Sequence, residues 1–208
     1  IVPQLGPISS IMGEIMLIAL PADPAQASAM QVREYADWVM RPRLLTIPGV
    51  AQVIPMGGEV RQYRVEINPA QLQALGVERD QLAAALQGFG ANTSGGFLEA
   101  NGREVLIRQI GRTSRIDKLK NLVVSVRNGQ SILLRQVAEV KLAPATKRGD
   151  ASYNGKPAVI LSVQKQPSAD SVVVTRAVEQ AMKDLAKSRP PGVAEPQFLF
   201  RQADFIEH

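Results

Sequence analysis

Residues 158–193, AVILSVQKQPSADSVVVTRAVEQAMKDLAKSRPPGV, decide the fold of this 208-residue chain. Residues 158–166 alternate apolar and polar side chains, which is typical of a strand with one buried face. Residues 170–187 begin with aspartate, a favoured N-cap, and continue with apolar residues at helical spacing. Pro191-Gly192-Val193 interrupts this pattern, and residues 197–202 predict another strand. The C-terminal part therefore predicts a β-α-β unit.

The same order of elements occurs near the N-terminus. Residues 11–20 predict a largely buried strand, and Asp23-Pro24 supplies an N-cap followed by a residue tolerated at the first helical position. We expect the helix to run through Met40 and to kink or break at Pro42, which lacks a backbone N–H. Residues 50–56 predict the second strand of this unit.

One constant offset relates the two units. Pro24 and Pro167 are 143 positions apart, and Pro48-Gly49-Val50 and Pro191-Gly192-Val193 are separated by the same number. The offset also aligns three apolar positions of the first strand with three of the later one: Met16, Ile18 and Leu20 with Val159, Leu161 and Val163. Because the turns and the apolar rhythm agree, we interpret the two units as an internal repeat.

The residues between the two units predict a separate α+β unit. Its elements are strands at residues 60–67, 105–110, 122–126 and 132–142, and helices at residues 69–75, 78–87 and 115–120. Asn-Gly pairs, which favour turns with positive φ, occur at 101, 128 and 154. Asn128-Gly129 is the strongest hairpin signal because apolar strands flank it closely.

The expected architecture is an α+β fold, in which a ferredoxin-like split β-α-β repeat carries an inserted α+β subdomain. Two β-α-β units of this kind form four antiparallel strands with both helices on one face. The predicted boundaries are residues 1–58 for the first half of the repeat, 59–155 for the insertion and 156–208 for the second half.

The amino-acid composition of the chain excludes some classes of function. The chain has no cysteine, which excludes disulfides and thiolate sites. A net charge of +5 leaves open a basic module that binds nucleic acid or an acidic protein. The basic residues are scattered and aromatic residues make up only 4%, so a solvated basic face is favoured over nucleic-acid binding.

We expect a segment of a longer protein. The longest apolar stretch, residues 11–20, contains Glu14 and is half the length of about 20 residues that a bilayer requires. The first residues lack a basic start, a long apolar centre and an initiator methionine. The chain is therefore expected to begin within a protein and to contain no membrane-spanning segment.

No catalytic site and no cofactor are predicted. The only histidine is His208, so the sequence offers no partner for nucleophilic or acid–base chemistry. Gly88-Phe89-Gly90 and Gly95-Gly96 lack the strand-to-helix setting and the Lys-Ser/Thr ending of a phosphate loop, which favours flexible loops at both places.

Metal binding remains open at the first strand. Met12, Glu14 and Met16 alternate and are expected to share a face, where carboxylate and thioether groups could hold a metal ion transiently. The alternative is that both methionines pack under a helix, because methionine mainly fills cores. Only a bulge or bend near Gly13 would place Glu14 on the other face.

Short motifs follow one another along essentially the whole chain: Gly13-Glu14-Ile15, Trp38-Val39 with Arg41-Pro42 and Leu44, and the segments at residues 47–53, 134–140, 154–159 and 200–206. In this order they closely resemble the heavy-metal efflux branch of the resistance-nodulation-division transporters. Each motif is weak alone, and together they are specific. Asn68 and Gln136 stand where relatives often have aspartate, at predicted strand ends where Asn and Gln can make similar turn contacts.

The resemblance implies the place of the chain in a larger assembly. It would be the second N-terminal porter subdomain, interrupted by the N-terminal part of the docking domain. The whole would be a homotrimeric, proton-driven pump of the Gram-negative inner membrane that exports a metal cation. A periplasmic adaptor and an outer-membrane channel would be its partners, and this chain would be a periplasmic portion without catalytic activity or bound nucleic acid. A multidrug exporter of the wider family is the alternative.

The resemblance also implies site residues. Glu14, Leu17 and Met56 would line the substrate cleft, with Glu14 and Met56 as candidate metal ligands. A loop at residues 92–103 would reach a neighbouring protomer, with Gly95, Gly96, Phe97 and Leu98 at its centre. A hairpin tip would face the outer-membrane channel, formed by Arg127, Asn128, Gly129 and Gln130.

Overall fold

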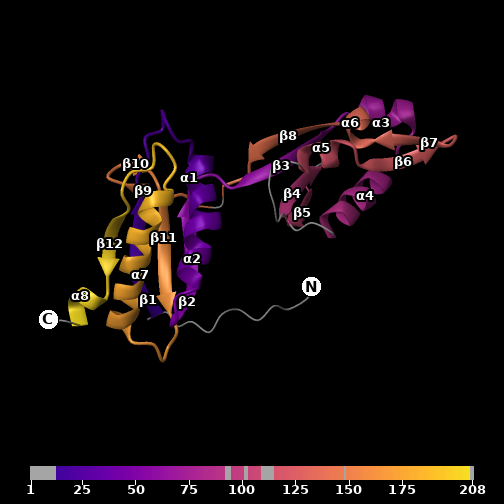
Figure 1. Cartoon of the computed structure of the whole chain (residues 1–208). Helices are drawn as coiled ribbons and strands as arrows, with labels where there is room; N and C mark the ends of the chain where they lie inside the picture. The colour runs from indigo at the N-terminus through magenta and orange to yellow at the C-terminus, as the bar shows by residue number, and fades with distance from the viewer. Residues whose placement is uncertain (1–12, 92–94, 101–102, 109–114, 148, 207–208) are drawn as a thin grey trace. The chain divides into compact units, whose positions relative to one another are not determined.

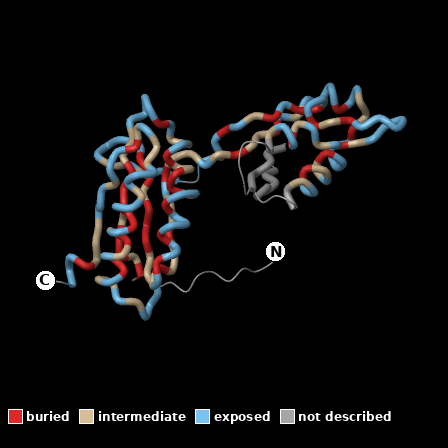
Figure 2. The backbone as a smooth tube through the Cα atoms, in the orientation of Figure 1, coloured by how far each residue is buried: buried red, intermediate tan, exposed pale blue. Residues whose placement is uncertain are grey.

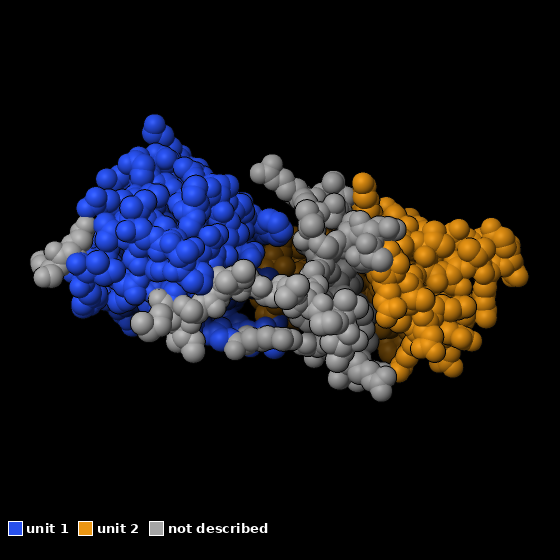
Figure 3. Space-filling model, turned by 90° about the horizontal axis from the view of Figure 1, so that it is seen from below, with its two compact units in different colours: residues 1–60, 146–208 blue, residues 61–145 orange. Residues whose placement is uncertain are grey.

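The chain folds into two compact α+β units, which Figure 3 colours separately. The computed structural model describes residues 13–91, 95–100, 103–108, 115–147 and 149–206. The first unit combines residues 1–60 with residues 146–208, and the second contains residues 61–145. Residues 146–155, which the predicted boundaries assign to the insertion, thus lie with the first unit.

The first unit contains a four-stranded antiparallel sheet in the order β12-β1-β11-β2 (Figure 1). Its strands are β1 (Glu14–Leu20), β2 (Val50–Gly57), β11 (Val159–Lys165) and β12 (Gln197–Arg201). A small hairpin pairs β9 (Ser152–Tyr153) with β10 (Lys156–Pro157). The helices are α1 (Ala29–Tyr35), the π-helix η2 (Ala36–Met40), α2 (Arg41–Leu45), α7 (Ser171–Leu185), the 3-10 turn η3 (Ala186–Ser188) and α8 (Ala203–Ile206).

One apolar core lies between this sheet and its helices (Figure 2). The strands contribute the six residues aligned by the repeat, all of them buried. The helices contribute buried residues from both halves: Val32, Tyr35, Met40, Leu44, Val174, Val178, Ala181 and Met182. Because these side chains pack against the same strand positions, α1, α2 and α7 cover one face of the sheet. The Tyr35 hydroxyl also donates to the Leu185 carbonyl oxygen at 3.2 Å.

Backbone hydrogen bonds follow the 143-residue offset. The Gln166 amide donates to the Gly49 oxygen at 2.7 Å, and the Asp23 amide donates to the Gly192 oxygen at 2.8 Å. Gly49 and Gly192 have φ values of +91° and +83°, a region that glycine adopts without the penalty of a β-carbon. The turn of each half therefore binds the chain just beyond the first strand of the other half.

The first helix begins at Ser28 and not at Asp23, so the predicted N-cap was wrong. Asp23 closes a turn, because its carboxylate accepts from the Ala25 amide at 3.0 Å. Ser28 forms a capping box: its hydroxyl accepts from the Gln31 amide at 3.2 Å, and the Gln31 side chain accepts from the Ser28 amide at 2.8 Å. Both residues are good caps, and the local turn decides which one starts the helix.

The predicted disturbance near Pro42 takes the form of a π-helical turn. The Arg41 amide donates to the Ala36 oxygen, five residues back, and Pro42 lies in the first turn of α2. A proline ring clashes with the carbonyl four residues before it, and a widened turn relieves that contact. The helical rod therefore continues to Leu45.

The second unit is built from three antiparallel ribbons, β3 with β8, β4 with β5 and β6 with β7. The strands are β3 (Arg61–Ile67), β4 (Gly95–Ala100), β5 (Arg103–Arg108), β6 (Val123–Arg127), β7 (Gln130–Leu133) and β8 (Ala138–Pro144). The helices are α3 (Pro69–Leu75), α4 (Arg79–Ala91), α5 (Arg115–Lys120) and α6 (Leu134–Val137). Its separate core includes Leu72, Leu82, Leu86, Leu119, Leu134 and Val137.

Two predictions for the second unit were wrong. Residues 132–142 do not form one strand, because the short helix α6 separates β7 from β8. Gly88 and Gly90 belong to α4, and Gly95 and Gly96 begin β4, so these glycines do not form flexible loops.

Among the helices of the described residues, none has both the length and the apolar character needed to cross a bilayer.

The turn contacts expected of Asn68 and Gln136 are present. The Asn68 side chain caps α3 by accepting from the amides of Ala70 and Gln71 at 3.1 and 3.2 Å. The Gln136 side chain accepts from the Leu133 amide at 2.7 Å at the start of α6. Neutral amide oxygens thus satisfy exposed helix-start amides here.

Candidate functional site

The sheet face opposite the helices carries the candidate cleft residues. Leu17 and Ile54 both lie opposite Ser162, while Ala19 and Met56 both lie opposite Ile160. Side chains alternate along a strand, and the neighbours Leu161 and Val163 point into the helix-side core. Leu17 and Met56 therefore share the sheet face that the helices do not cover, the open face, and Met56 is 39% exposed.

Glu14 lies on this open face and not with Met16. The β1–β11 register shifts between them: Glu14 lies opposite Gln164, whereas Met16 lies opposite Val163 and is fully buried. The expectation that the two residues share a face was wrong. The irregularity lies at Ile15, which also joins the core, and it reverses the parity of Glu14. Met12 lies outside the described residues.

The Glu14 carboxylate is held by a buried hydroxyl. The Ser162 Oγ donates to Glu14 Oε2 at 2.5 Å, and Ser162 is only 3% exposed while Glu14 is half-buried. Gln164 and Gln52 continue the row across β11 and β2. One carboxylate and several neutral oxygen donors thus gather at this end of the face, a donor set suited to weak cation binding.

Met56 lies at the other end of the same face. Met56 lies opposite Ile160 of β11, whereas Glu14 lies opposite Gln164, four residues further along the strand. Four residues correspond to about 13 Å at about 3.3 Å per residue. The two side chains therefore offer separate contacts and do not converge on one ion within this sheet. Among the described residues, no group of three or more His, Cys, Asp or Glu side chains could hold a metal.

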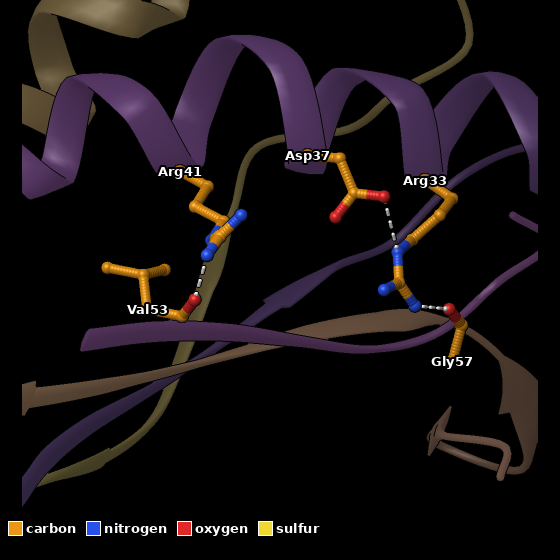
Figure 4. A network of polar contacts seen from close by, with 5 residues as sticks. All are labelled: Arg33, Asp37, Arg41, Val53 and Gly57. Carbon is orange, nitrogen blue, oxygen red and sulfur yellow. Dashed lines mark hydrogen bonds and ion pairs between the residues drawn. The ribbon is translucent and has the colours of Figure 1, made fainter. Parts of the chain in front are cut away.

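Two arginines fasten the strand that carries Met56 (Figure 4). Arg33 Nη1 donates to the Gly57 oxygen at 2.7 Å, and its Nε pairs with Asp37 at 2.9 Å. Arg41 Nε donates to the Val53 oxygen at 3.0 Å. These bonds satisfy carbonyls on the outer edge of β2, which pairs through its other edge with β11.

Sequence reasoning missed this arrangement, because the scattered basic residues indicate only a solvated basic face and do not single out Arg33 or Arg41. In a regular α-helix, positions eight apart differ by about 80° around the axis. The extra residue of the π-helical turn between Arg33 and Arg41 reduces that difference, so both side chains reach β2. The Arg41-Pro42 pair was a visible signal, since the proline favours the widened turn.

The predicted docking loop is a strand pair at its centre. Gly95, Gly96, Phe97 and Leu98 lie in β4, where Gly95 is opposite Arg108 and Phe97 is opposite Leu106 of β5. Residues 92–94 and 101–102 of the predicted loop lie outside the described residues. The described part of this segment therefore forms an antiparallel strand pair, β4 with β5.

The predicted hairpin at residues 127–130 is confirmed. Asn128 and Gly129 have φ values of +48° and +77°, as a two-residue turn between β6 and β7 requires. The Arg127 guanidinium lies over Gly76, where an added β-carbon would overlap it. Arg127 thus contacts its own unit, and Asn128, Gly129 and Gln130 form the exposed tip.

The second unit also has an open cleft of about 1090 Å³. Its lining includes Glu66 and Glu139, which are opposite each other in β3 and β8, together with Lys120 and Arg135. None of the candidate residues named above lines this cleft. Lys141 pairs with Glu66 at 2.7 Å and offsets part of the repulsion between the two carboxylates.

Comparisons with known proteins agree with the motif order. The AcrB/AcrD/AcrF family model matches residues 1–208. The cobalt-zinc-cadmium resistance protein CzcA of Cupriavidus metallidurans is 30% identical over 200 residues, which cover 93% of this chain and 19% of CzcA. The nickel and cobalt resistance protein CnrA of the same species is 35% identical over 162 residues, 78% of this chain and 15% of CnrA.

A third relative is the cation efflux system protein CusA of Escherichia coli, which is 30% identical over 194 residues, 91% of this chain and 18% of CusA. The chain thus spans less than a fifth of the length of these relatives. By the match over its whole length, the chain belongs to the AcrB/AcrD/AcrF family, and its relatives are heavy-metal efflux transporters of the resistance-nodulation-division type.

Proposed function

We propose that this chain is the cleft wall and docking scaffold of a proton-driven heavy-metal cation efflux pump. The observation that carries the proposal is the placement of Glu14 on the open face of the first sheet, together with Leu17 and Met56. The relatives, which are named for metal resistance or cation efflux, support the substrate class. No chemical step is assigned to the chain, since its role is to bind and release an ion.

The first unit would be a ferredoxin-like porter subdomain. The order β12-β1-β11-β2 is the order expected when two β-α-β units interlock, and the shared 143-residue offset supports an internal repeat. Residues 1–58 and 156–208 would be its two halves. The inserted residues 59–155 would be the docking subdomain, whose body is the second unit at residues 61–145.

Transport would use rigid-body movement of this subdomain against another part of the pump. In the open state, the half-buried Glu14 carboxylate is accessible on the sheet face and can take up a cation. Closure would add ligands from the facing part and exclude water. A single carboxylate with neutral oxygen neighbours holds an ion weakly, which suits a transporter because the ion must leave again.

The second unit would make the assembly contacts of a homotrimer in the Gram-negative inner membrane, with this portion in the periplasm. The β4–β5 strand pair, which contains Gly95, Gly96, Phe97 and Leu98, would reach the neighbouring protomer. The exposed tip Asn128–Gly129–Gln130 would face the outer-membrane channel, and a periplasmic adaptor would complete the assembly.

A multidrug exporter is the second candidate. Away from Glu14, the open face is apolar, with Leu17, Ile54, Ile160 and the exposed Met56. A face of this kind also suits organic substrates. The two candidates differ in which substrate depends on the Glu14 charge.

The test is Glu14→Gln in the full-length pump, with Glu195→Gln as the matched control because Glu195 is an exposed carboxylate of the same unit. At equal expression, Glu14→Gln is expected to abolish most of the resistance to the exported cation, while the control retains it. Undiminished metal resistance in Glu14→Gln would refute the role of Glu14. Loss of resistance to organic compounds alone would favour the multidrug exporter.

A further inference from the structure

We infer that Ser162 is a positioning residue for the Glu14 carboxylate, an inference that rests on the proposed function. Ser162 lies in the middle of β11 and donates its hydroxyl hydrogen to Glu14 Oε2 at 2.5 Å. Ser162 itself would not contact the bound cation. Its role is to hold one carboxylate oxygen so that the other, Oε1, is presented on the open face.

The hydroxyl is buried in an apolar strand. Ser162 is 3% exposed and lies between the core residues Leu161 and Val163, which are fully buried. A buried hydroxyl without a partner costs free energy, so such groups are nearly always hydrogen-bonded. Among the described residues, Glu14 is the acceptor that satisfies this donor.

The internal repeat shows that the fold does not need a hydroxyl here. The position equivalent to Ser162 in the first half, 143 residues earlier, is Ala19, which is fully buried in the same layer of the sheet. The position equivalent to Glu14 in the second half is Pro157. Each half thus supplies one member of the Ser162–Glu14 pair, and the two repeat-related positions, Ala19 and Pro157, carry neither a hydroxyl nor a carboxylate.

The strand irregularity brings the two groups together. In the β1–β11 register, Ser162 lies opposite Leu17, while Glu14 lies opposite Gln164 on the same side of the sheet. Without the shift at Ile15, the Glu14 side chain would point toward the helices and away from Ser162. The bulge thus places Glu14 on the open face, and the Ser162 hydroxyl fixes the Glu14 side chain there.

A fixed carboxylate binds an ion with less loss of side-chain freedom. Groups that hydrogen-bond to a ligating carboxylate typically change metal affinity or activity by about 10- to 100-fold when they are removed. We therefore expect Ser162→Ala to raise the half-saturating cation concentration by about 10-fold or more. The maximal transport rate is expected to change little, because Ser162 takes no part in the movement.

The experiment measures cation transport by the full-length pump in proteoliposomes, with Zn²⁺, Co²⁺ and Cu⁺ tested one at a time. The variants are Ser162→Ala, Ser162→Thr, which keeps a hydroxyl, Glu14→Gln and the double variant. Thr175→Val is the matched control, because Thr175 is 3% exposed, lies in α7 of the same unit and its hydroxyl has no hydrogen-bond partner. This control removes a buried hydroxyl that does not face Glu14.

We expect a higher half-saturating cation concentration in Ser162→Ala, recovery in Ser162→Thr and no change in Thr175→Val. The double variant should be no worse than Glu14→Gln alone, because the serine acts through the carboxylate. A Ser162→Ala loss that persists undiminished in the Glu14→Gln background would show a merely structural role and overturn the inference.

Different outcomes test the role of Glu14 and the role of Ser162. If Glu14→Gln transports all three cations normally, the proposed role of Glu14 fails and the inference falls with it. If Glu14→Gln loses transport while Ser162→Ala keeps the affinity of the unaltered pump, only the positioning role of Ser162 is overturned.

Discussion

Gly49 and Gln166 are joined by a backbone hydrogen bond of 2.7 Å that connects the turn of one half-repeat to the strand exit of the other. The equivalent bond joins Gly192 and Asp23 at 2.8 Å. The two halves are far apart in sequence and hold each other at these turns. Replacing either glycine should therefore weaken the whole first unit.

Gly49→Ala is expected to destabilise the first unit by about 2–4 kcal/mol, because φ is +91° and the new β-carbon would lie 2.7 Å from Val174 Cγ2. Gly155→Ala is the control, since its φ is +72° and nothing lies within 4 Å of the added atom. It should cost about 1 kcal/mol. Urea unfolding measures both, and equal losses would contradict the contribution of the close contact.

Arg41→Met should expose the outer edge of β2, because the Val53 oxygen loses its donor while the apolar stem is retained. We expect a loss of about 1–2 kcal/mol and concentration-dependent self-association through the freed edge. Light scattering and urea unfolding follow the two effects. Arg43→Met is the control, since Arg43 is exposed and its nearest acid, Asp184, is 3.6 Å away. An equal response of the two variants would rule out edge protection.

Asp170→Ala should cost about 1 kcal/mol, because the Asp170 carboxylate accepts from the amides of Val172 and Val173 at 2.8 and 3.0 Å and starts the long helix α7. Asp184→Ala, near the end of the same helix, should change stability by less than about 0.5 kcal/mol. Thermal or urea unfolding compares the two. A neutral Asp170→Ala would show that tertiary packing alone maintains the start of α7.

Gly76→Ala should displace Arg127 from its place over the end of α3, since the added β-carbon would overlap the guanidinium and Gly76 has φ of +58°. We expect a loss of about 2–3 kcal/mol in the second unit. In the Gly76→Ala/Arg127→Ala double variant, the overlap disappears and only the backbone strain of about 1 kcal/mol remains. Strict additivity of the two substitutions in urea unfolding would argue against contact between them.

Met56→Leu should separate soft from hard cations, because thioethers favour Cu⁺ whereas carboxylate and amide oxygens favour harder ions. The substitution conserves volume and removes only the sulfur ligand. If Met56 contacts the ion, Cu⁺ transport by the full-length pump should weaken about 10-fold while Zn²⁺ and Co²⁺ transport stays near normal. A uniform change for all three cations would assign Met56 a packing role.

Local sequence by itself determined much of the fold. The two Pro-Gly-Val turns, the aligned apolar positions and Asn128-Gly129 each correspond to observed turns and strands. These features are local, since backbone preference and alternation of burial depend on a few neighbouring residues. The family also follows from sequence, because motif order survives at about 30% identity.

Only the tertiary structure decided the side on which the candidate ligand lies. Alternation alone put Glu14 with Met16, and the register shift at Ile15 separated them, because a bulge is settled by pairing with β11 and by the helices above it. The Ser162–Glu14 bond joins residues 148 positions apart, and the Arg41–Val53 bond depends on a π-helical turn. Long-range pairing energies, which no short window contains, determined these contacts.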